Sequence, residues 1–523
     1  MNDRLALLHL ALLVPTLLAL ILRVWSLGAF SVTHDEAYGL WIATRSLAPT
    51  GVLPAAARDV HPPLYYLLLH FWLALGPSKD VWARLPSVLL GVALVPALYA
   101  LGRRLWNVRA GLVAALLAAL SPLAVAQARE ARMYPLAVLL LTLAAYALLR
   151  ATKDDSRQTK SAPLCWWAAY TVLSVLALYT HYYAGFVLVA FTCYVLRVAY
   201  SMPHQTKHET RNTFYALLSA LAIATLYLPW LPALADQFSR VRADFWIPPP
   251  SPEGVGKVAQ TLSFFAITPR PPTATPVDLA VKVVGAACVA VALLVVCAAS
   301  LLSGCINQPG GVEALAGNRL KARLEHVLRG SGWLPALWLA VPLLLAIAVS
   351  LVGPSVFEPR YFAVCLPAFV LLVARGVVAL PGRVLKATLL TGLVIASLAS
   401  LHTLTTFPAY RSPDTRSAAA WLRAYAAPAD LVVHTSQVSL RPIVWYNGDD
   451  AAGVLIDDAV LQPGPGLAAA SRVLLVVPYD VRLAAGPRRA DATAAEWAAQ
   501  HDLWDLRTVA RFWGIHIYEW ANG

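Results

Sequence analysis

The feature that most constrains this chain is a succession of apolar segments, each long enough to form a membrane-crossing helix. Such a helix needs about 20 mostly apolar residues. Only 13% of the residues are charged, about half the share of an ordinary soluble protein. We therefore predict an all-α polytopic membrane protein with about eleven transmembrane helices, at 5–27, 81–101, 109–127, 133–150, 164–180, 184–200, 213–233, 277–302, 333–352, 361–379 and 385–403.

The charges predict which way the chain crosses the membrane. Residues 1–403 carry a net charge of +15, whereas residues 404–523 carry −2. Alternate loops of the first part, at 103–109, 150–160, 197–211, 319–329 and 375–386, each carry three or four basic side chains. Because cytoplasmic loops are enriched in Lys and Arg, we expect a cytoplasmic N-terminus and an outer C-terminus. No basic cluster lies on a soluble face, so nucleic-acid binding is excluded.

Three parts of the chain are expected outside the membrane core. Residues 28–80 form a long outer loop whose segment 61–75 predicts a helix lying at the interface. A second outer loop covers 234–276, with a short helix near 255–266. The domain boundary falls at 403, and 404–523 predicts a small extracytoplasmic α/β domain. Its expected elements are a helix at 415–426 and strands at 430–434, 472–477 and 514–520.

The first candidate catalytic group is the acidic pair that follows the first apolar segment. In Thr33-His34-Asp35-Glu36, Thr33 and Glu36 have the spacing of a capping box at a helix start. The alternative is that Glu36 takes part in catalysis. Asp35 is not needed by the cap, and adjacent helical side chains point about 100° apart. Asp35 is therefore the candidate general base, because a carboxylate can take the proton of an attacking hydroxyl.

Three outer arginines defy the charge rule and are candidates for binding phosphate. Arg129 and Arg132 lie in one predicted outer turn, and Arg360 lies in another. Arginine presents a planar fork of donors that matches phosphate oxygens. The simpler interpretation is ion pairing with the neighbouring acids, Glu130 and Glu358. The six cysteines are not spaced as a metal site, and no metal and no cofactor is expected.

Histidines and tyrosines in the same outer segments are candidates for a substrate pocket. These are His61, Tyr65, Tyr66, His181 and Tyr361. Aromatic side chains can stack on a sugar ring, but they also anchor proteins at the membrane interface. Both interpretations fit the sequence.

Taken in order, these segments resemble glycosyltransferase family 39 of the GT-C superfamily, in a bacterial member. The motifs are Asp35-Glu36, His61-Pro62-Pro63-Leu64-Tyr65-Tyr66, Arg129-Glu130-Ala131-Arg132-Met133-Tyr134, Tyr179-Thr180-His181-Tyr182 and Pro359-Arg360-Tyr361-Phe362. The resemblance covers about residues 1–405 and includes dolichyl-phosphate-mannose protein mannosyltransferases and aminoarabinose transferases. It implies inverting transfer from a polyprenyl-phosphate sugar outside the cytoplasmic membrane, without a catalytic metal. It also implies that Asp35 is the base and that Arg132 and Arg360 contact the donor phosphate.

The acceptor and the rival functions stay open at this point. The chain lacks the acid-Lys pair that aminoarabinose transferases, as we align them, carry near His61, and its loop 234–276 is too short for a eukaryotic lumenal domain. The acceptor is thus a lipid, a protein or a cell-envelope glycan. A flippase of lipid-linked sugars is the main alternative, although charges are rare in the middle of the predicted spans, where transport sites lie. A non-catalytic scaffold would leave the outer charges unexplained.

Overall fold

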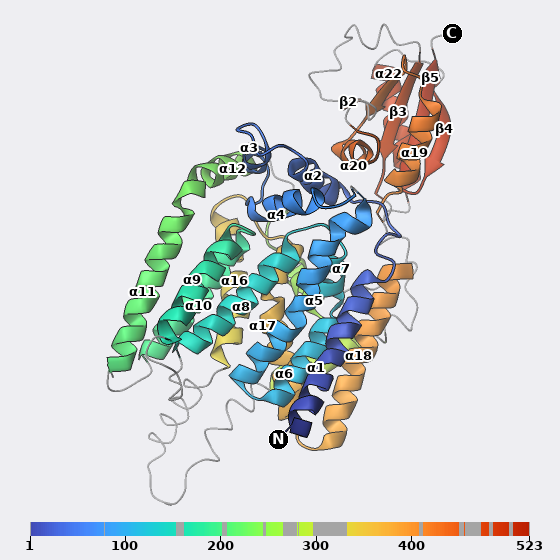
Figure 1. Cartoon of the computed structure of the whole chain (residues 1–523). Coiled ribbons are helices and arrows are strands. Elements are labelled where there is room, and N and C mark those ends of the chain that lie inside the picture. The colour runs from blue at the N-terminus through green and yellow to red at the C-terminus, as the bar shows by residue number, and fades with distance from the viewer. Residues whose placement is uncertain are drawn as a thin grey trace, which may run out of the picture.

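The computed structural model describes residues 2–77, 79–152, 162–200, 207–243, 247–264, 280, 282–295, 332–406, 412–448, 454–455, 472–480, 485–500 and 506–521. Figure 1 shows a bundle of long helices with a small sheet-containing domain at one end. The N-terminus lies at the opposite end of the bundle. The predicted fold class, a helical membrane protein with a small C-terminal α/β domain, is confirmed.

Every predicted span contains a helix in the described part of the chain. Within the span predicted at 277–302, the structure describes a helix over 282–295. The others are α1 (Asn2–Val24), α5 (Asp80–Leu105), α6 (Val108–Leu120), α7 (Pro122–Ala128), α8 (Tyr134–Thr152), α9 (Ala162–Leu178), α10 (Tyr183–Tyr200), α11 (Lys207–Tyr227), α16 (Trp333–Val352), α17 (Leu366–Ala379) and α18 (Arg383–Thr406). By length and composition, six helical stretches among the described residues can cross a membrane alone, or seven with one bent pair.

The bent pair adds a detail to one predicted span. The segment 109–127 consists of two helices, α6 and α7, that meet at an angle of 55°. The break has a local cause: the Ser121 hydroxyl accepts a hydrogen bond from Ala124 N at 3.3 Å, and Pro122 starts the new helix without an N–H to donate. After the bend, the turn that follows α7 reaches the C-terminal end of α1, where Arg129 Nη2 donates to Ser26 O at 3.1 Å.

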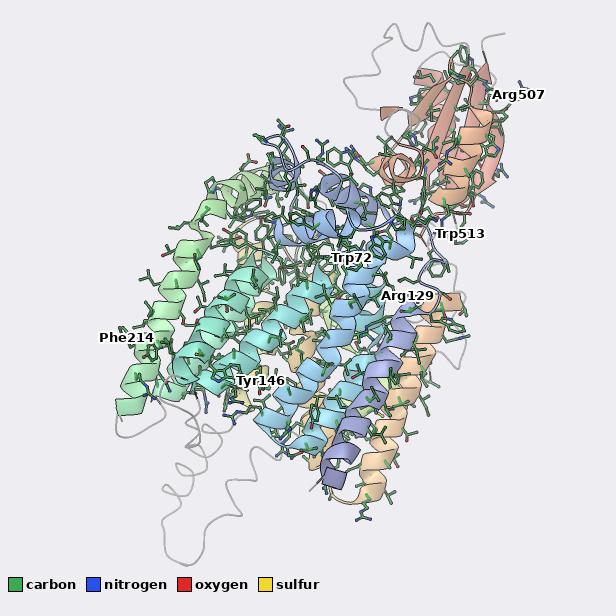
Figure 2. All side chains as sticks on the ribbon, viewed as in Figure 1. Trp72, Arg129, Tyr146, Phe214, Arg507 and Trp513 are labelled. Atoms are coloured by element: carbon green, nitrogen blue, oxygen red, sulfur yellow. The ribbon has the colours of Figure 1, made fainter. Side chains whose placement is uncertain are left out.

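The surface of the bundle is apolar, as expected of helices that face lipid. Large hydrophobic side chains are exposed along α1, α11 and α18; Phe214, for example, is 61% exposed and projects away from the bundle in Figure 2. In contrast, α8 and α17 are buried along most of their length. A soluble protein would not leave such a surface to water. The chain is a multi-pass membrane protein.

Short helices cover the end of the bundle that faces the sheet domain (Figure 1), namely α2 (His34–Ala43), α3 (Val52–Arg58), α4 (Leu64–Leu73) and α12 (Leu231–Ala243). The other short helices are η1 (Leu228–Trp230), α13 (Pro252–Leu262) and η2 (Pro359–Cys365). The predicted helices at 61–75 and 255–266 correspond to α4 and α13. Two prolines, Pro62 and Pro63, precede α4 and suit a helix start because they lack the N–H groups that a first turn leaves unbonded.

The C-terminal domain has a five-stranded sheet in the order β2-β1-β3-β5-β4. Its strands are β1 (Leu431–His434), β2 (Val454–Leu455), β3 (Arg472–Pro478), β4 (Arg507–Phe512) and β5 (Ile515–Ala521). β1 runs parallel to β2 and β3, whereas β5 is antiparallel to β3 and β4. Helices α19 (Thr415–Tyr425) and α20 (Gln437–Asn447) pack on one face, and α22 (Gly486–Gln500) packs on the other. The predicted helix and three strands are confirmed.

The C-terminal domain is held against the 28–80 segment by polar contacts. Asp80, at the start of α5, accepts hydrogen bonds from Arg416 Nη2 at 2.5 Å, Trp445 Nε1 at 3.0 Å and Tyr446 Oη at 2.7 Å. Helix α20 packs on α2, where the Arg441 guanidinium stacks 4.3 Å from the centre of the Trp41 ring. The domain thus supports the helix that carries Asp35.

Candidate active site

The site is built around the first turn of α2. Thr33 is the N-cap: its hydroxyl accepts from Glu36 N at 3.2 Å, and Glu36 Oε2 accepts from Thr33 N at 2.9 Å. The predicted capping box is confirmed. Because the cap fixes the first turn, it also fixes the direction in which the Asp35 side chain leaves the helix.

Glu36 has a structural role beyond the cap. Its buried carboxylate forms a two-point ion pair with Arg84, with Nε–Oε1 at 2.8 Å and Nη2–Oε2 at 2.9 Å. The other three N–H donors of Arg84 bond the carbonyl oxygens of Leu27, Phe30 and Ser31. Ala131 N donates to Glu36 Oε1 at 2.9 Å. The pair therefore ties the first outer loop to α5 and to the 129–132 turn, and its groups are already occupied.

Asp35 contacts two of the candidate phosphate-binding arginines. Its Oδ2 lies 2.6 Å from Arg360 Nη1 and 3.7 Å from Arg132 Nη2, and the side chain is 33% exposed. Arg132 Nη1 also donates to the Asp35 carbonyl at 3.0 Å. Burial raises the pKa of Asp35, but the two guanidiniums outweigh it and hold the pKa below the usual value. Three segments that are distant in the sequence thus converge on one carboxylate.

Two neutral histidines line the inner side of this cluster. His61 Nε2 lies 3.2 Å from Arg132 Nη2, and its ring stacks on His181 with centroids 5.7 Å apart. Burial lowers the pKa of both histidines, with Arg132 adding to the effect, and brings that of His181 to about 3. His181 Nδ1 accepts from Tyr183 N at 3.2 Å, so its proton is assigned to Nε2, which has no partner among the described residues.

The remaining predicted pocket residues divide into two groups. Tyr361 lies with the histidines, its ring 5.3 Å from His181 and 6.2 Å from His61. Tyr65 and Tyr66 are buried below α2, and their hydroxyls contact Ser87 and Asp59 respectively. These two tyrosines are packed into the protein and stabilise the loop. Their rings do not form an open face on which a sugar could stack.

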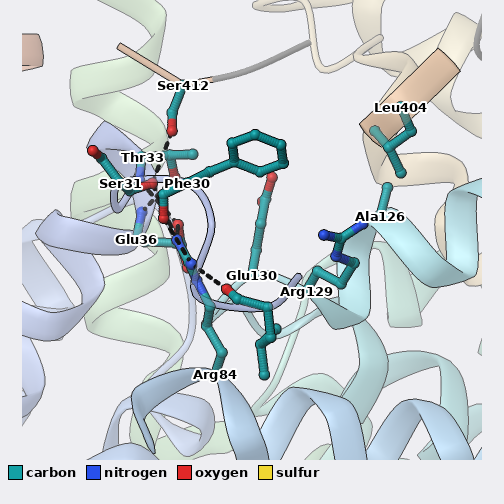
Figure 3. A pocket seen from close by; sticks show the side chains of 11 residues that line it. Phe30, Ser31, Thr33, Glu36, Arg84, Ala126, Arg129, Glu130, Leu404 and Ser412 are labelled. Atoms are coloured by element: carbon teal, nitrogen blue, oxygen red, sulfur yellow. Dashed lines mark hydrogen bonds and ion pairs between the residues drawn. The ribbon is translucent and has the colours of Figure 1, made fainter. Parts of the chain in front are cut away.

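Arg129 is not brought to Asp35. It lines a separate small pocket with Glu36, Arg84 and Glu130 (Figure 3). The alternative interpretation of the sequence was that the arginines pair with the neighbouring acids, Glu130 and Glu358. Only the pair with Glu358 is formed among the described residues. Arg360 Nε lies 3.6 Å from Glu358 Oε1, but Glu130 forms no ion pair within the described residues. Among those same residues, no group of three or more His, Cys, Asp or Glu side chains is arranged to hold a metal.

Sequence reasoning missed Arg84 because it lies inside the segment 81–101, which was assigned to the membrane. A buried arginine at the end of an apolar span needs a carboxylate partner. That rule would have directed attention to the acids of the preceding loop. The geometry as a whole places one partly exposed carboxylate between two arginines, an arrangement suited to accepting a proton beside a bound anion.

Comparison with known proteins shows what this chain is similar to. Residues 60–230 match the family model described as dolichyl-phosphate-mannose-protein mannosyltransferase. Two structures of ArnT from Cupriavidus metallidurans, one apo and one bound to undecaprenyl phosphate, match with a TM-score of 0.55 and 13% identity over 97% of both chains. An oligosaccharyltransferase from Archaeoglobus fulgidus matches with a TM-score of 0.47 and 11% identity, over 90% of this chain and 69% of that one. No curated protein matches significantly.

The matched segment contains His61, Arg132 and His181, and the ArnT fold extends over nearly the whole chain. These matches agree with the resemblance seen in the sequence. The chain is a multi-pass membrane protein that has the fold of the ArnT structures, and its residues 60–230 are similar to the dolichyl-phosphate-mannose-protein mannosyltransferase family.

Proposed function

We propose that this protein is an inverting glycosyltransferase that moves a sugar from a polyprenyl-phosphate donor to an acceptor hydroxyl at the outer face of the bacterial cytoplasmic membrane. The observation that carries the proposal is the contact of Asp35 with Arg360 and Arg132 at one end of an apolar bundle. The apolar helices provide a place for the prenyl tail, and the arginines provide one for the phosphate. The bound undecaprenyl phosphate of the similar ArnT structure supports this choice of donor.

The same contacts explain how the base is activated. Before the donor binds, Arg360 and Arg132 neutralise Asp35 and make it a weak base. The donor phosphate competes for both guanidiniums, because phosphate matches their fork as well as a carboxylate does. Once the arginines turn to the phosphate, the pKa of Asp35 rises toward its ordinary value. The base therefore becomes effective only when the donor is in place.

The transfer then follows with all atoms accounted for. The acceptor oxygen forms a bond to the anomeric carbon while its proton passes to Asp35. The bond between that carbon and the phosphate oxygen breaks, and polyprenyl phosphate leaves. Attack from the side opposite the phosphate inverts the anomeric configuration. Arg360 and Arg132 stabilise the charge that develops on the departing phosphate, and the unpartnered Nε2–H of His181 is placed to donate to a sugar or phosphate oxygen.

Turnover of the donor tests this function against a flippase. Purified protein in nanodiscs, supplied with a polyprenyl-phosphate sugar and an acceptor extract, should release free polyprenyl phosphate. A flippase would instead move the donor between leaflets with its glycosyl–phosphate bond intact. Lipid-linked sugar that crosses the bilayer without bond cleavage would overturn the proposed reaction.

Loss of Arg360 should weaken use of the donor. We expect Arg360→Ala to raise the KM for the donor by about 10- to 100-fold, since a hydrogen bond to a charged group contributes about 1.5–3 kcal/mol. The KM for the acceptor should change little. Steady-state kinetics with each substrate varied in turn give both values. Arg58→Ala, which removes an exposed arginine from the same end of the bundle, is the control. Equal losses for both substrates would contradict phosphate binding by Arg360.

The pH profile provides a second test of the Asp35–Arg360 contact. Because the Arg360 charge lowers the pKa of Asp35, Arg360→Gln should raise that pKa. The reaction needs ionised Asp35. On acidification, the variant should therefore lose activity at a higher pH than the unsubstituted protein does. The acidic limb of kcat/KM reports groups in the free enzyme and is expected to move to higher pH in the variant. An acidic limb that stays in place would mean that another group is the base.

A further inference from the structure

A small pocket lies behind α2, apart from the Asp35 cluster. It has a volume of about 80 Å³ and is bounded by the 27–36 loop, the end of α7, the outer end of α18 and Ser412. Figure 3 shows the Arg129 guanidinium turned toward the pocket, with Phe30 on one side and Leu404 on the other. The Glu36–Arg84 pair forms one wall, and Asp35 does not line the pocket. We call it the Arg129 pocket.

Arg129 is a cation without a matching anion. Its side chain donates one hydrogen bond, to Ser26 O, and no carboxylate lies within ion-pair distance of it among the described residues. Burial lowers the pKa of Arg129, and the neighbouring charge of Arg84 lowers it further. Holding an unpaired guanidinium in a partly buried place costs free energy. Most of its donor fork therefore stays available for an anion in the pocket.

Glu130, on the same turn, makes the pocket sensitive to pH. Burial raises its pKa to about 7, with the negative charges of Glu36 and Asp35 adding to the rise and the positive charges of Arg132 and Arg84 opposing it. Its carboxyl group has no hydrogen-bond partner in the described part of the chain. Below neutral pH the group is protonated and can itself donate to an anion. The Glu36–Arg84 charges cancel, so the pocket then carries the single positive charge of Arg129.

The position of the pocket indicates what kind of anion reaches it. Apolar side chains near it on α1 and α18 are exposed, including Ile21, Val24 and Leu398, so lipid surrounds these helices. The pocket is at their outer ends, at the expected depth of lipid headgroups. Its volume of about 80 Å³ is large enough to receive a small anionic group such as phosphate.

A larger cleft continues from the pocket toward the C-terminal domain. It has a volume of about 420 Å³, shares Phe30, Ser31 and Ser412 with the Arg129 pocket, and reaches Arg416 and Trp513. The cleft is large enough for the polar group that a lipid phosphate carries. The small pocket and the cleft together therefore fit a phosphate with a polar substituent.

We propose that the Arg129 pocket is a second phosphate site, which binds the headgroup phosphate of a membrane phospholipid independently of the sugar donor. Arg129 forms the charged contact, and the 420 Å³ cleft receives the rest of the headgroup. The Asp35 cluster and the Arg129 pocket are then two separate anion sites, and the buried Glu36–Arg84 pair lines the second. The proposal concerns binding alone and does not depend on sugar transfer.

Lipid binding to the purified full chain tests the proposal. Native mass spectrometry in detergent would count bound phosphatidylglycerol, with diacylglycerol of the same chains as the probe that lacks phosphate. We expect Arg129→Gln to reduce phosphatidylglycerol affinity at least tenfold. Arg58→Gln, which removes an exposed outer charge, and Arg360→Ala, which alters the Asp35 cluster, should retain it. Protein without substitution should bind phosphatidylglycerol more tightly than diacylglycerol.

The other outcomes would overturn the proposal. Unchanged binding to Arg129→Gln, or equal binding of diacylglycerol, would exclude a phosphate site in the pocket. Loss of binding in Arg360→Ala alone would assign the lipid to the Asp35 cluster. An arginine-modifying reagent distinguishes free phosphate from a lipid. If inorganic phosphate protects Arg129 from the reagent and phosphatidylglycerol does not, the pocket is a site for free phosphate and not for a lipid. Glu130→Gln should bind lipid equally at pH 6 and pH 8, whereas the unsubstituted protein should bind more weakly at pH 8.

Discussion

Replacing Asp35 with Asn should lower the rate of sugar transfer by about 10²- to 10⁴-fold, the range over which general base catalysis contributes. Asn has the same shape but cannot take a proton, and it loses the ion pair with Arg360 that orients the side chain. The comparison is kcat with saturating donor and acceptor. Asp236→Asn, which alters an exposed acid paired with Arg240 on α12, should retain full activity.

The assignment of Asp35 requires that the variant be folded. Asp35 is partly exposed, so Asp35→Asn should elute as a single species and unfold near the temperature of the unsubstituted protein. Asp35→Glu should recover part of the activity, because it restores a carboxylate at a shifted position. Full activity in folded Asp35→Asn would show that another group accepts the proton.

The largest effect on stability is expected at Glu36. Substitution of Glu36 by Gln leaves Arg84 charged and buried without a carboxylate, which typically costs about 3–5 kcal/mol. It also weakens the cap of α2 and the bond from Ala131 N. Thermal unfolding in detergent should show a clearly lower midpoint. Glu253→Gln, which breaks the exposed pair with Lys257, should leave the midpoint almost unchanged.

The response of activity distinguishes a structural Glu36 from a catalytic one. A structural role predicts that Glu36→Gln retains measurable transfer at low temperature, where the loop is still ordered. A catalytic role predicts a stable protein with the same loss of kcat as Asp35→Asn. The second result would contradict our assignment of Glu36 to support.

Local patterns in the sequence were enough to predict much of the fold. The length of the apolar segments predicted the membrane helices. A segment that crosses the membrane must form a helix because its backbone has to satisfy its own hydrogen bonds. The spacing of Thr33 and Glu36 predicted the cap, since both of its bonds lie within one turn. The bend at Ser121-Pro122 also had a signal in the sequence, because Ser-Pro is a common helix start. The apolar residues on both sides of the pair nevertheless favoured one continuous span.

Features that depend on distant contacts were not predicted. Residue patterns alone indicated three candidate phosphate-binding arginines without separating them, and only the family resemblance favoured Arg132 and Arg360. Whether an arginine meets Asp35 depends on how α7, α2 and η2 pack, and Arg129 turns toward Ser26 instead. In the same way, nothing local to Asp80 or α20 indicates that they hold the C-terminal domain against α2. These contacts arise only when the helices are assembled.

A structure of the protein with bound undecaprenyl phosphate would test the central claim most directly. We expect the phosphate to lie within hydrogen-bonding distance, about 2.7–3.2 Å, of Nη atoms of both Arg360 and Arg132, with the Asp35–Arg360 pair opened. The prenyl tail should lie along the apolar helices. A phosphate bound elsewhere, with Arg360 still paired to Asp35, would contradict the proposed site and the mechanism built on it.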